Sequence, residues 1–140
     1  MENLVKIISH ENDKVRQHTA ARVNQKIDRS TEEAVQSFSG ASRERILARI
    51  DELDREWDID RVLMLNFGVI SLPQLLAARQ DRRWLWGPLL MTPFLIMHAV
   101  VGWCPPVLWF RRMGFRSRLE IENEKRSLFK LLETGTTQTA

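Results

Sequence analysis

The distribution of apolar and charged positions divides the chain into three parts. Residues 62–110 contain two uncharged, mostly apolar runs, 62–78 and 84–110, separated by a charged segment at 79–83. An uncharged apolar run of about 18 residues is typical of a membrane-spanning helix, because a bilayer core is roughly 30 Å thick. As helices, the first run and the uninterrupted part of the second between its prolines each span about 25 Å. The pattern predicts a transmembrane hairpin over 62–110 with its turn at 79–83.

Tryptophan placement agrees with a membrane hairpin, because tryptophan is enriched at the two water interfaces of a membrane. Four of the five tryptophans lie in the second run, two near each end: Trp84 and Trp86, then Trp103 and Trp109. A turn that stopped inside the hydrocarbon would bury three arginines at roughly 2.5–3.5 kcal/mol each. The hairpin is therefore expected either to cross completely, which we favour, or to lie flat in the interface.

The N-terminal flank, residues 1–61, predicts two helices after a weakly ordered stretch at 1–29. The capping-box spacing of Ser and Glu at 30–33 predicts a short helix to about residue 40. A longer helix is predicted over 42–60, since its apolar residues recur every three or four positions. These residues are Ile46, Ile50, Leu53 and Trp57.

The C-terminal flank, residues 111–140, predicts one helix and a loose tail. A second capping-box pair, Ser117 and Glu120, predicts the start of this helix, and Gly135 its end. Its apolar residues include Ile121, Leu128 and Leu132. Two destinations fit the apolar faces of the two flanks: each other, or a second subunit.

The short flanks of the hairpin predict its orientation. Over 15 residues on either side, the flanks carry eight Lys and Arg, against three in the turn. Those nearest the hairpin ends are Arg61, Arg111 and Arg112, and those of the turn are Arg79, Arg82 and Arg83. Loops rich in Lys and Arg stay in the cytoplasm, so both termini are expected there.

The composition of the whole chain excludes several kinds of functional site. The 140 residues carry a net charge of +3 and include one cysteine and three histidines. One cysteine excludes an internal disulfide, and no set of metal ligands or nucleophile elbow occurs. The mixed charge of the flanks forms no basic stripe and gives no support for nucleic-acid binding. We expect no enzyme activity, no cofactor and no metal.

Three residues inside the apolar runs are candidates for a structural or chemical role: Asn66, His98 and Cys104. Asn66 lies 13 residues before the turn and His98 lies 15 residues after it, so a hairpin places them at similar depth, where a mutual hydrogen bond would join the helices. The alternative is a proton or ligand site at His98. Cys104 is either a small apolar residue or a thiol that handles sulfur or senses oxidants, with Arg111 and Arg112 near in sequence.

Several motifs resemble the YgaP-like transmembrane domain family over most of the chain, from about His18 to Leu132. They are Arg82-Arg83-Trp84-Leu85, His98, Gly102-Trp103-Cys104-Pro105-Pro106 and Arg111-Arg112-Met113-Gly114-Phe115-Arg116. The upstream Trp57-Asp58-Ile59-Asp60-Arg61 and the stretch at 18–28 also resemble the cytoplasmic leader of the bacterial members. The resemblance implies a bacterial inner-membrane hairpin of mostly unassigned function. Some relatives carry a rhodanese sulfurtransferase domain and dimerise through the hairpin. Residues 1–61 contain no such domain, so the resemblance implies no sulfurtransferase catalysis.

We therefore expect an all-α membrane protein with a two-helix transmembrane hairpin flanked by cytoplasmic amphipathic helices. The predicted function is a structural or interaction module that sits in the lipid bilayer and self-associates or binds a membrane partner. Two alternatives remain: a thiol-based sulfur-handling or redox-sensing protein that uses Cys104, and a soluble helical adaptor.

Overall fold

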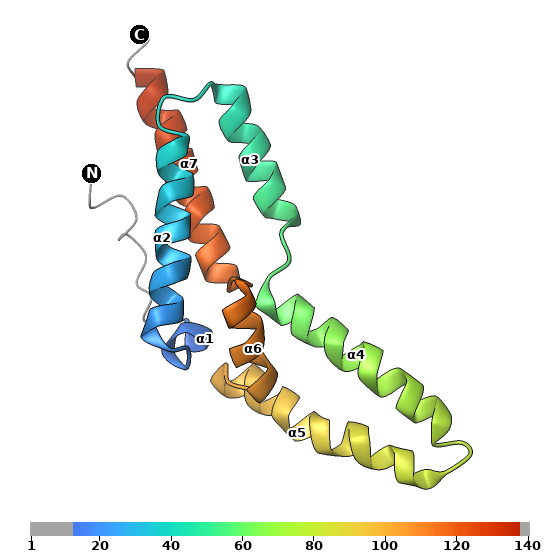
Figure 1. The fold of residues 1–140 in the computed structure, drawn as a ribbon. Coiled ribbons are helices and arrows are strands. Elements are labelled where there is room, and N and C mark those ends of the chain that lie inside the picture. Colours follow the sequence, from blue (N-terminus) through green and yellow to red (C-terminus); the bar gives the residue numbers. More distant parts are fainter. Residues whose placement is uncertain (1–12, 138–140) are drawn as a thin grey trace.

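The computed structural model describes residues 13–137, and this part of the chain is helical without any strand (Figure 1). The helices in order are α1 (Lys14–Gln17), α2 (Ala21–Ser37), α3 (Arg43–Arg55), α4 (Ile59–Ala77), the 3-10 helix η2 (Arg82–Leu85), α5 (Trp86–Val101), α6 (Pro105–Met113) and α7 (Arg118–Thr137). The predicted all-α fold class is confirmed.

The helices form two regions joined by α6. Helices α2, α3 and α7 lie side by side and are called the bundle below. Helices α4 and α5 contact each other and project together from one end of the bundle (Figure 1). Helix α6 packs on α4 and leads from the end of α5 back to α7.

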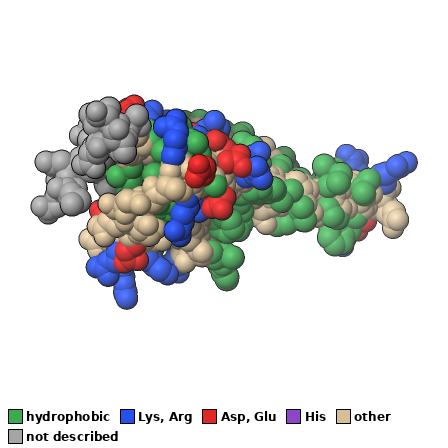
Figure 2. All heavy atoms as spheres, turned by 90° about the horizontal axis from the view of Figure 1, so that it is seen from above, with side chains coloured by type: hydrophobic (Ala, Val, Ile, Leu, Met, Phe, Trp, Pro, Cys, Tyr) green, Lys and Arg blue, Asp and Glu red, His purple; other side chains and the backbone are tan. Residues whose placement is uncertain are grey.

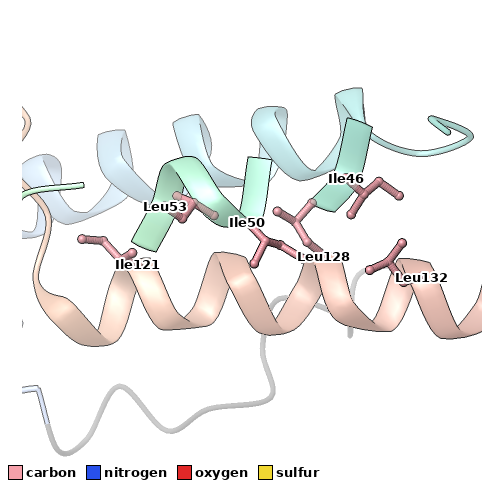
Figure 3. Packing of buried hydrophobic residues seen from close by; sticks show 6 residues of the cluster. All are labelled: Ile46, Ile50, Leu53, Ile121, Leu128 and Leu132. Carbon is pink, nitrogen blue, oxygen red and sulfur yellow. The ribbon is translucent and has the colours of Figure 1, made fainter. Parts of the chain in front are cut away.

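The core of the bundle lies between α3 and α7. Two rows of apolar side chains from these helices point toward one another (Figure 3): Ile46, Ile50 and Leu53 from α3, and Ile121, Leu128 and Leu132 from α7. Burying each such side chain contributes about 1.5–3 kcal/mol. The two predicted apolar faces therefore pack against each other within one chain.

The N-terminal part differs from the prediction. Helix α2 begins at Ala21, so the Ser30 and Glu33 spacing lies inside a helix and marks no helix start. Its buried residues Ile27, Thr31 and Val35 share one face at a spacing of four. The weak order expected for 1–29 is wrong for residues 13–29, which are folded against the rest of the chain, and residues 1–12 lie outside the described residues.

The helix predicted over 42–60 is two helices. Ser42 caps α3 as predicted by accepting a hydrogen bond from the Arg45 N–H, but α3 ends at Arg55. The Asp58 side chain then accepts from the Arg61 N–H at 2.8 Å and starts α4. Trp57 lies in this break and is 48% exposed, so it is not part of the α3–α7 core. The apolar spacing continues to Trp57, but the Asp58 cap starts a new helix directly after it, so the chain does not form one continuous helix.

The second apolar run is also divided. Helix α5 ends at Val101 and is capped by Gly102, whose φ of +77° is left-handed, and Pro105 is the first residue of α6. A second core forms where α6 returns along the start of α4; it comprises Val15, Ile59, Leu63, Cys104 and Val107. The run at 84–110 is therefore a 3-10 turn, one helix along α4 and a separate short helix.

Helix α7 starts as predicted and ends later. The Ser117 N–H donates to the Glu120 carboxylate at 2.8 Å, and the Glu120 N–H donates to the Ser117 hydroxyl at 3.2 Å. This reciprocal pair is a capping box. The helix continues through Gly135 to Thr137, so the predicted end before Gly135 is wrong. A glycine costs a helix only about 1 kcal/mol, which does not by itself end it.

Candidate functional site

The surface of the α4–α5 pair is apolar over most of its length (Figure 2). Seven large apolar residues of each helix are 38–64% exposed. They are Met64, Leu65, Val69, Ile70, Leu72, Leu75 and Leu76 in α4, and Trp86, Leu89, Leu90, Phe94, Ile96, Val100 and Val101 in α5. Monomeric soluble proteins rarely expose a continuous apolar surface of this kind.

Two helical stretches are long and apolar enough to cross a membrane: Arg43–Ala77, whose apolar part is α4, and Arg82–Val101. The core helices of a soluble protein pass the same test of length and composition, but they are mostly buried. Here only 17% of the apolar window of the first stretch and 6% of the second are buried inside the protein. Exposure therefore separates this pair from an ordinary core hairpin.

The far end of the pair is charged, as the blue side chains at the tip in Figure 2 show. Arg79, Arg82 and Arg83 are exposed there, and the Asp81 side chain accepts from the Arg83 N–H at 2.9 Å to start η2. The polypeptide thus turns through a capped 3-10 segment that presents three arginines beyond the apolar surface.

The tryptophans lie near the two ends of the apolar surface. Trp84 and Trp86, near the tip, are 53% and 62% exposed. At the bundle end, Trp109 on α6 is 72% exposed and Trp103 is half-buried. Both groups thus place aromatic surface where the apolar region meets charged residues.

The expected hydrogen bond between Asn66 and His98 is not formed. His98 Nε2 instead lies 2.8 Å from Asp60 Oδ1, and its Nδ1 has no hydrogen-bond partner among the described residues. Asn66 lies about two turns further along α4 and lines a small cavity with Cys104. The prediction fails because α5 is paired so that His98 meets the first turn of α4, at Asp60, rather than the middle of that helix.

Cys104 is a buried apolar residue in this fold. It is 3% exposed, it packs with Leu63 and Val107, and it occupies the position before Pro105 at the start of α6. Burial raises the pKa of its thiol. Because a reactive cysteine must be both reachable and ionised, this environment opposes the sulfur-handling or redox-sensing alternative.

Two of the predicted orientation residues are exposed near the bundle end of the pair, and one is not. Arg61 and Arg112 are exposed, and the Arg61 guanidinium lies 5.8 Å from the centre of the Trp57 ring. Arg111 is only 1% exposed. In the folded chain Arg111 is therefore an internal ion-pair partner rather than a charge available to solvent.

Arg111 belongs to a buried group of charges that joins four helices. It donates to Glu120 at 2.5 and 2.8 Å, and to the Asn24 side-chain oxygen at 2.8 Å. Arg16 donates to the same Glu120 carboxylate at 2.8 Å and to Asp28 at 2.7 and 2.8 Å. This group, called the Glu120 network below, connects α1, α2, α6 and α7.

The Glu120 carboxylate is the centre of this network. Burial by itself would raise its pKa, but the hydrogen bonds and charge of Arg111, the Ser117 N–H and Arg16 together hold the pKa below its ordinary value. The carboxylate is therefore ionised in the folded protein at neutral pH, as a buried acid with two guanidinium partners must be.

A second group of charges joins α3 to α7. Arg49 donates to Glu124 at 3.0 and 3.1 Å, and Arg116 donates to Glu124 and, at 2.5 and 2.8 Å, to Glu56. Burial lowers the pKa of Arg116, but these two carboxylates outweigh it and raise the pKa above its ordinary value. Glu120 and Glu124 are one turn apart on the same face of α7, so the two groups of ion pairs follow each other along this helix.

Sequence reasoning missed both charge groups. Four of their contacts join residues 60–104 apart. The other three, Arg116–Glu124, Arg111–Glu120 and Arg16–Asp28, are 8, 9 and 12 residues apart and join different helices or a loop and a helix, so no spacing within one helix marks them. The only local signal is Glu120, which the capping-box pattern singles out. Among the described residues, no group of three His, Cys, Asp or Glu could hold a metal ion.

Comparison of the sequence with protein-family models, with curated proteins and with solved structures finds no match. Membership of the YgaP-like family stays a prediction from the sequence motifs at 18–28, 57–61 and 82–116.

Proposed function

We propose that the α4–α5 pair is a membrane-inserted hairpin and that the chain is a small, non-enzymatic membrane protein whose bundle acts as an interaction module. The observation that carries the proposal is the exposure of the apolar surface: the windows of the two candidate spans are 17% and 6% buried. An apolar surface of this size is unfavourable in water, and the hydrocarbon core of a bilayer removes it from water.

Full crossing is the arrangement that suits the tip. Residues 62–77 and 86–101 each span about 24 Å as helices. This is a few ångströms less than a bilayer core, and local thinning or extension of Arg side chains to the interface compensates for it. A half-inserted pair would leave Arg79, Arg82 and Arg83 in hydrocarbon at roughly 2.5–3.5 kcal/mol each.

The proposed orientation places the bundle in the cytoplasm. Several of the eight flanking Lys and Arg are ion-paired in the fold, including Arg49, Arg111 and Arg116. The positive-inside rule acts while the chain inserts, before these pairs form, and acidic residues contribute little to it. The count of eight against three therefore still favours the bundle as the cytoplasmic end.

The first test is extraction. Membranes from expressing cells are washed at alkaline pH, and the protein is expected to stay in the pellet. Release into the soluble fraction would contradict insertion and favour the soluble adaptor.

The second test uses the single cysteine to place the tip. In a Cys104→Ala background, Gln80→Cys labels the tip and Ser39→Cys labels the turn after α2; both side chains are exposed. A membrane-impermeant maleimide added to bacterial spheroplasts is expected to modify the tip cysteine only. The turn cysteine should react after the membrane is permeabilised. Reaction of the turn cysteine in intact spheroplasts, or of neither cysteine, would reject the crossing topology with a cytoplasmic bundle.

We also propose that the chain self-associates through the membrane pair, because two helices alone bury little of each other's surface. The mass of the detergent-solubilised protein, measured by light scattering with the detergent contribution subtracted, is expected to be a multiple of 16.4 kDa. A monomer at all protein concentrations would contradict self-association and leave insertion unaffected.

A further inference from the structure

A basic cavity lies in the bundle between α2 and the junction of α6 with α7. Its volume is about 560 Å³, within the range of about 300–1,000 Å³ found for ligand sites. The residues that line it include six basic and two acidic side chains. Five of these eight carry the ion pairs already described, and the remaining three, Arg22, Lys26 and Arg112, decide what the cavity attracts.

These three side chains form no ion pair with any described residue. Arg22 and Lys26 are one helical turn apart on α2, and Arg112 lies across from them near the end of α6. All three are exposed at the rim. A cavity rimmed by three uncompensated positive charges favours an anion.

A buried donor in the cavity wall also lacks an acceptor. Arg111 lines the cavity, and while its two terminal nitrogens serve Glu120 and Asn24, its Nε–H has no hydrogen-bond partner among the described residues. A buried N–H without an acceptor is destabilising, and it leaves an unsatisfied positive dipole in the wall of the cavity.

The position of Arg112 identifies the source of the anion. It is four residues after Leu108 and three after Trp109, so the three share one face of α6. Trp109 is 72% exposed and the neighbouring Met113 is 63% exposed. The rim of the cavity is therefore continuous with apolar and aromatic surface at the end of the membrane pair. In the proposed membrane arrangement, the headgroups of phospholipids lie at this end of the pair. An apolar surface beside the cavity suits a lipid with acyl chains, whereas it would contribute nothing to the binding of a soluble phosphate.

We propose that this cavity binds the phosphate headgroup of an anionic phospholipid from the leaflet beside the bundle. Arg22, Lys26 and Arg112 attract the phosphate, and the acyl chains follow the exposed side of α6 toward the α4–α5 pair. The inference rests on the proposed membrane insertion, and basic pockets at this level of membrane proteins are a known mode of lipid recognition.

The test is native mass spectrometry of the full chain in micelles that contain equal amounts of phosphatidylglycerol and phosphatidylcholine. The wild type is expected to retain phosphatidylglycerol preferentially. Each Lys or Arg near an anionic headgroup contributes about 1 kcal/mol, or about fivefold. Arg112→Gln should therefore lower the preference about fivefold, and the triple variant R22Q/K26Q/R112Q should abolish it.

A matched triple variant, R29Q/R43Q/R126Q, removes the same charge from exposed positions that do not line the cavity and is expected to keep the preference. Equal retention of the two lipids by the wild type, or equal loss in both triple variants, would overturn the proposal. Displacement of phosphatidylglycerol by millimolar inorganic phosphate or glycerol phosphate would overturn the lipid as the source. Flotation of the protein with vesicles of phosphatidylcholine alone reports insertion independently of the headgroup.

Discussion

Glu120→Gln is the substitution that tests the packing of the charged bundle most directly. The change keeps the size of the side chain and removes its charge. Glu120 accepts from Arg111 twice, from Arg16 and from the Ser117 N–H, all at 2.5–2.8 Å. Removing one partner of a buried ion pair costs about 3–5 kcal/mol, because the remaining charge stays buried without compensation.

A loss of this size is a large part of the stability of a domain, which is about 5–15 kcal/mol. Unfolding by urea in a non-ionic detergent is monitored by far-ultraviolet circular dichroism. Urea is the suitable denaturant because it is uncharged and does not screen ion pairs. The control is Glu122→Gln on the same helix, whose carboxylate is 41% exposed and lies 3.6 Å from Lys125. The control is expected to change the free energy of unfolding by less than about 0.5 kcal/mol. Equal effects of the two substitutions, or a loss below about 1 kcal/mol for Glu120→Gln, would refute the role of the network.

The same carboxylate predicts how stability depends on pH. Because its pKa is lowered in the fold, its stabilising contribution is present above the pKa of an unfolded glutamate, about 4.3. The contribution is lost as the pH falls through the folded pKa. Wild-type protein should therefore lose stability in acid more steeply than Glu120→Gln. Identical pH profiles would contradict this linkage.

Three further substitutions test other parts of the fold. Leu128→Ala should lower the free energy of unfolding by about 2–5 kcal/mol, whereas Phe129→Ala, at a residue that is 46% exposed, should have a much smaller effect in the same urea titration. Gly102→Ala should destabilise more than Gly40→Ala: both have positive φ, but a Cβ at 102 would lie 2.8 Å from the Lys14 carbonyl carbon, and one at 40 meets nothing within 4 Å. Both variants are compared by urea unfolding, and equal losses would count against the close packing at 102. Cys104 should resist modification by a maleimide in the folded protein and react after denaturation, because it is 3% exposed; rapid labelling of the native protein, measured by mass spectrometry, would revive the thiol hypothesis.

The parts that were predictable from the sequence are those with local causes. The apolar rows of α3 and α7 follow from helical spacing, and each needs a partner face of the same length. The capping box at Ser117 and Glu120 depends on residues three apart. The turn at 79–83 follows from charges between two apolar runs. Each of these features is decided within a few residues of itself.

The parts that were missed depend on contacts between distant segments. The spacing at Ser30 and Glu33 equals that of a capping box, but α2 is already helical there because Ile27, Thr31 and Val35 are buried along one face. Depth counted from the turn pairs Asn66 with His98, whereas the actual position of α5 along α4 brings His98 to Asp60. Local sequence patterns do not reveal how far one helix is shifted along its neighbour.

The order of the helices along the chain has a consequence for biosynthesis. Helices α2 and α3 precede the apolar pair, and α7, which supplies the other half of their core, follows it. At roughly 5–20 residues per second, the 36 residues from the end of α5 to the end of α7 take about 2–7 seconds to synthesise. The apolar pair is therefore complete while the first two bundle helices still lack a partner. In the proposed membrane arrangement the pair therefore inserts first, and the bundle closes afterwards beside an anchor that is already in place.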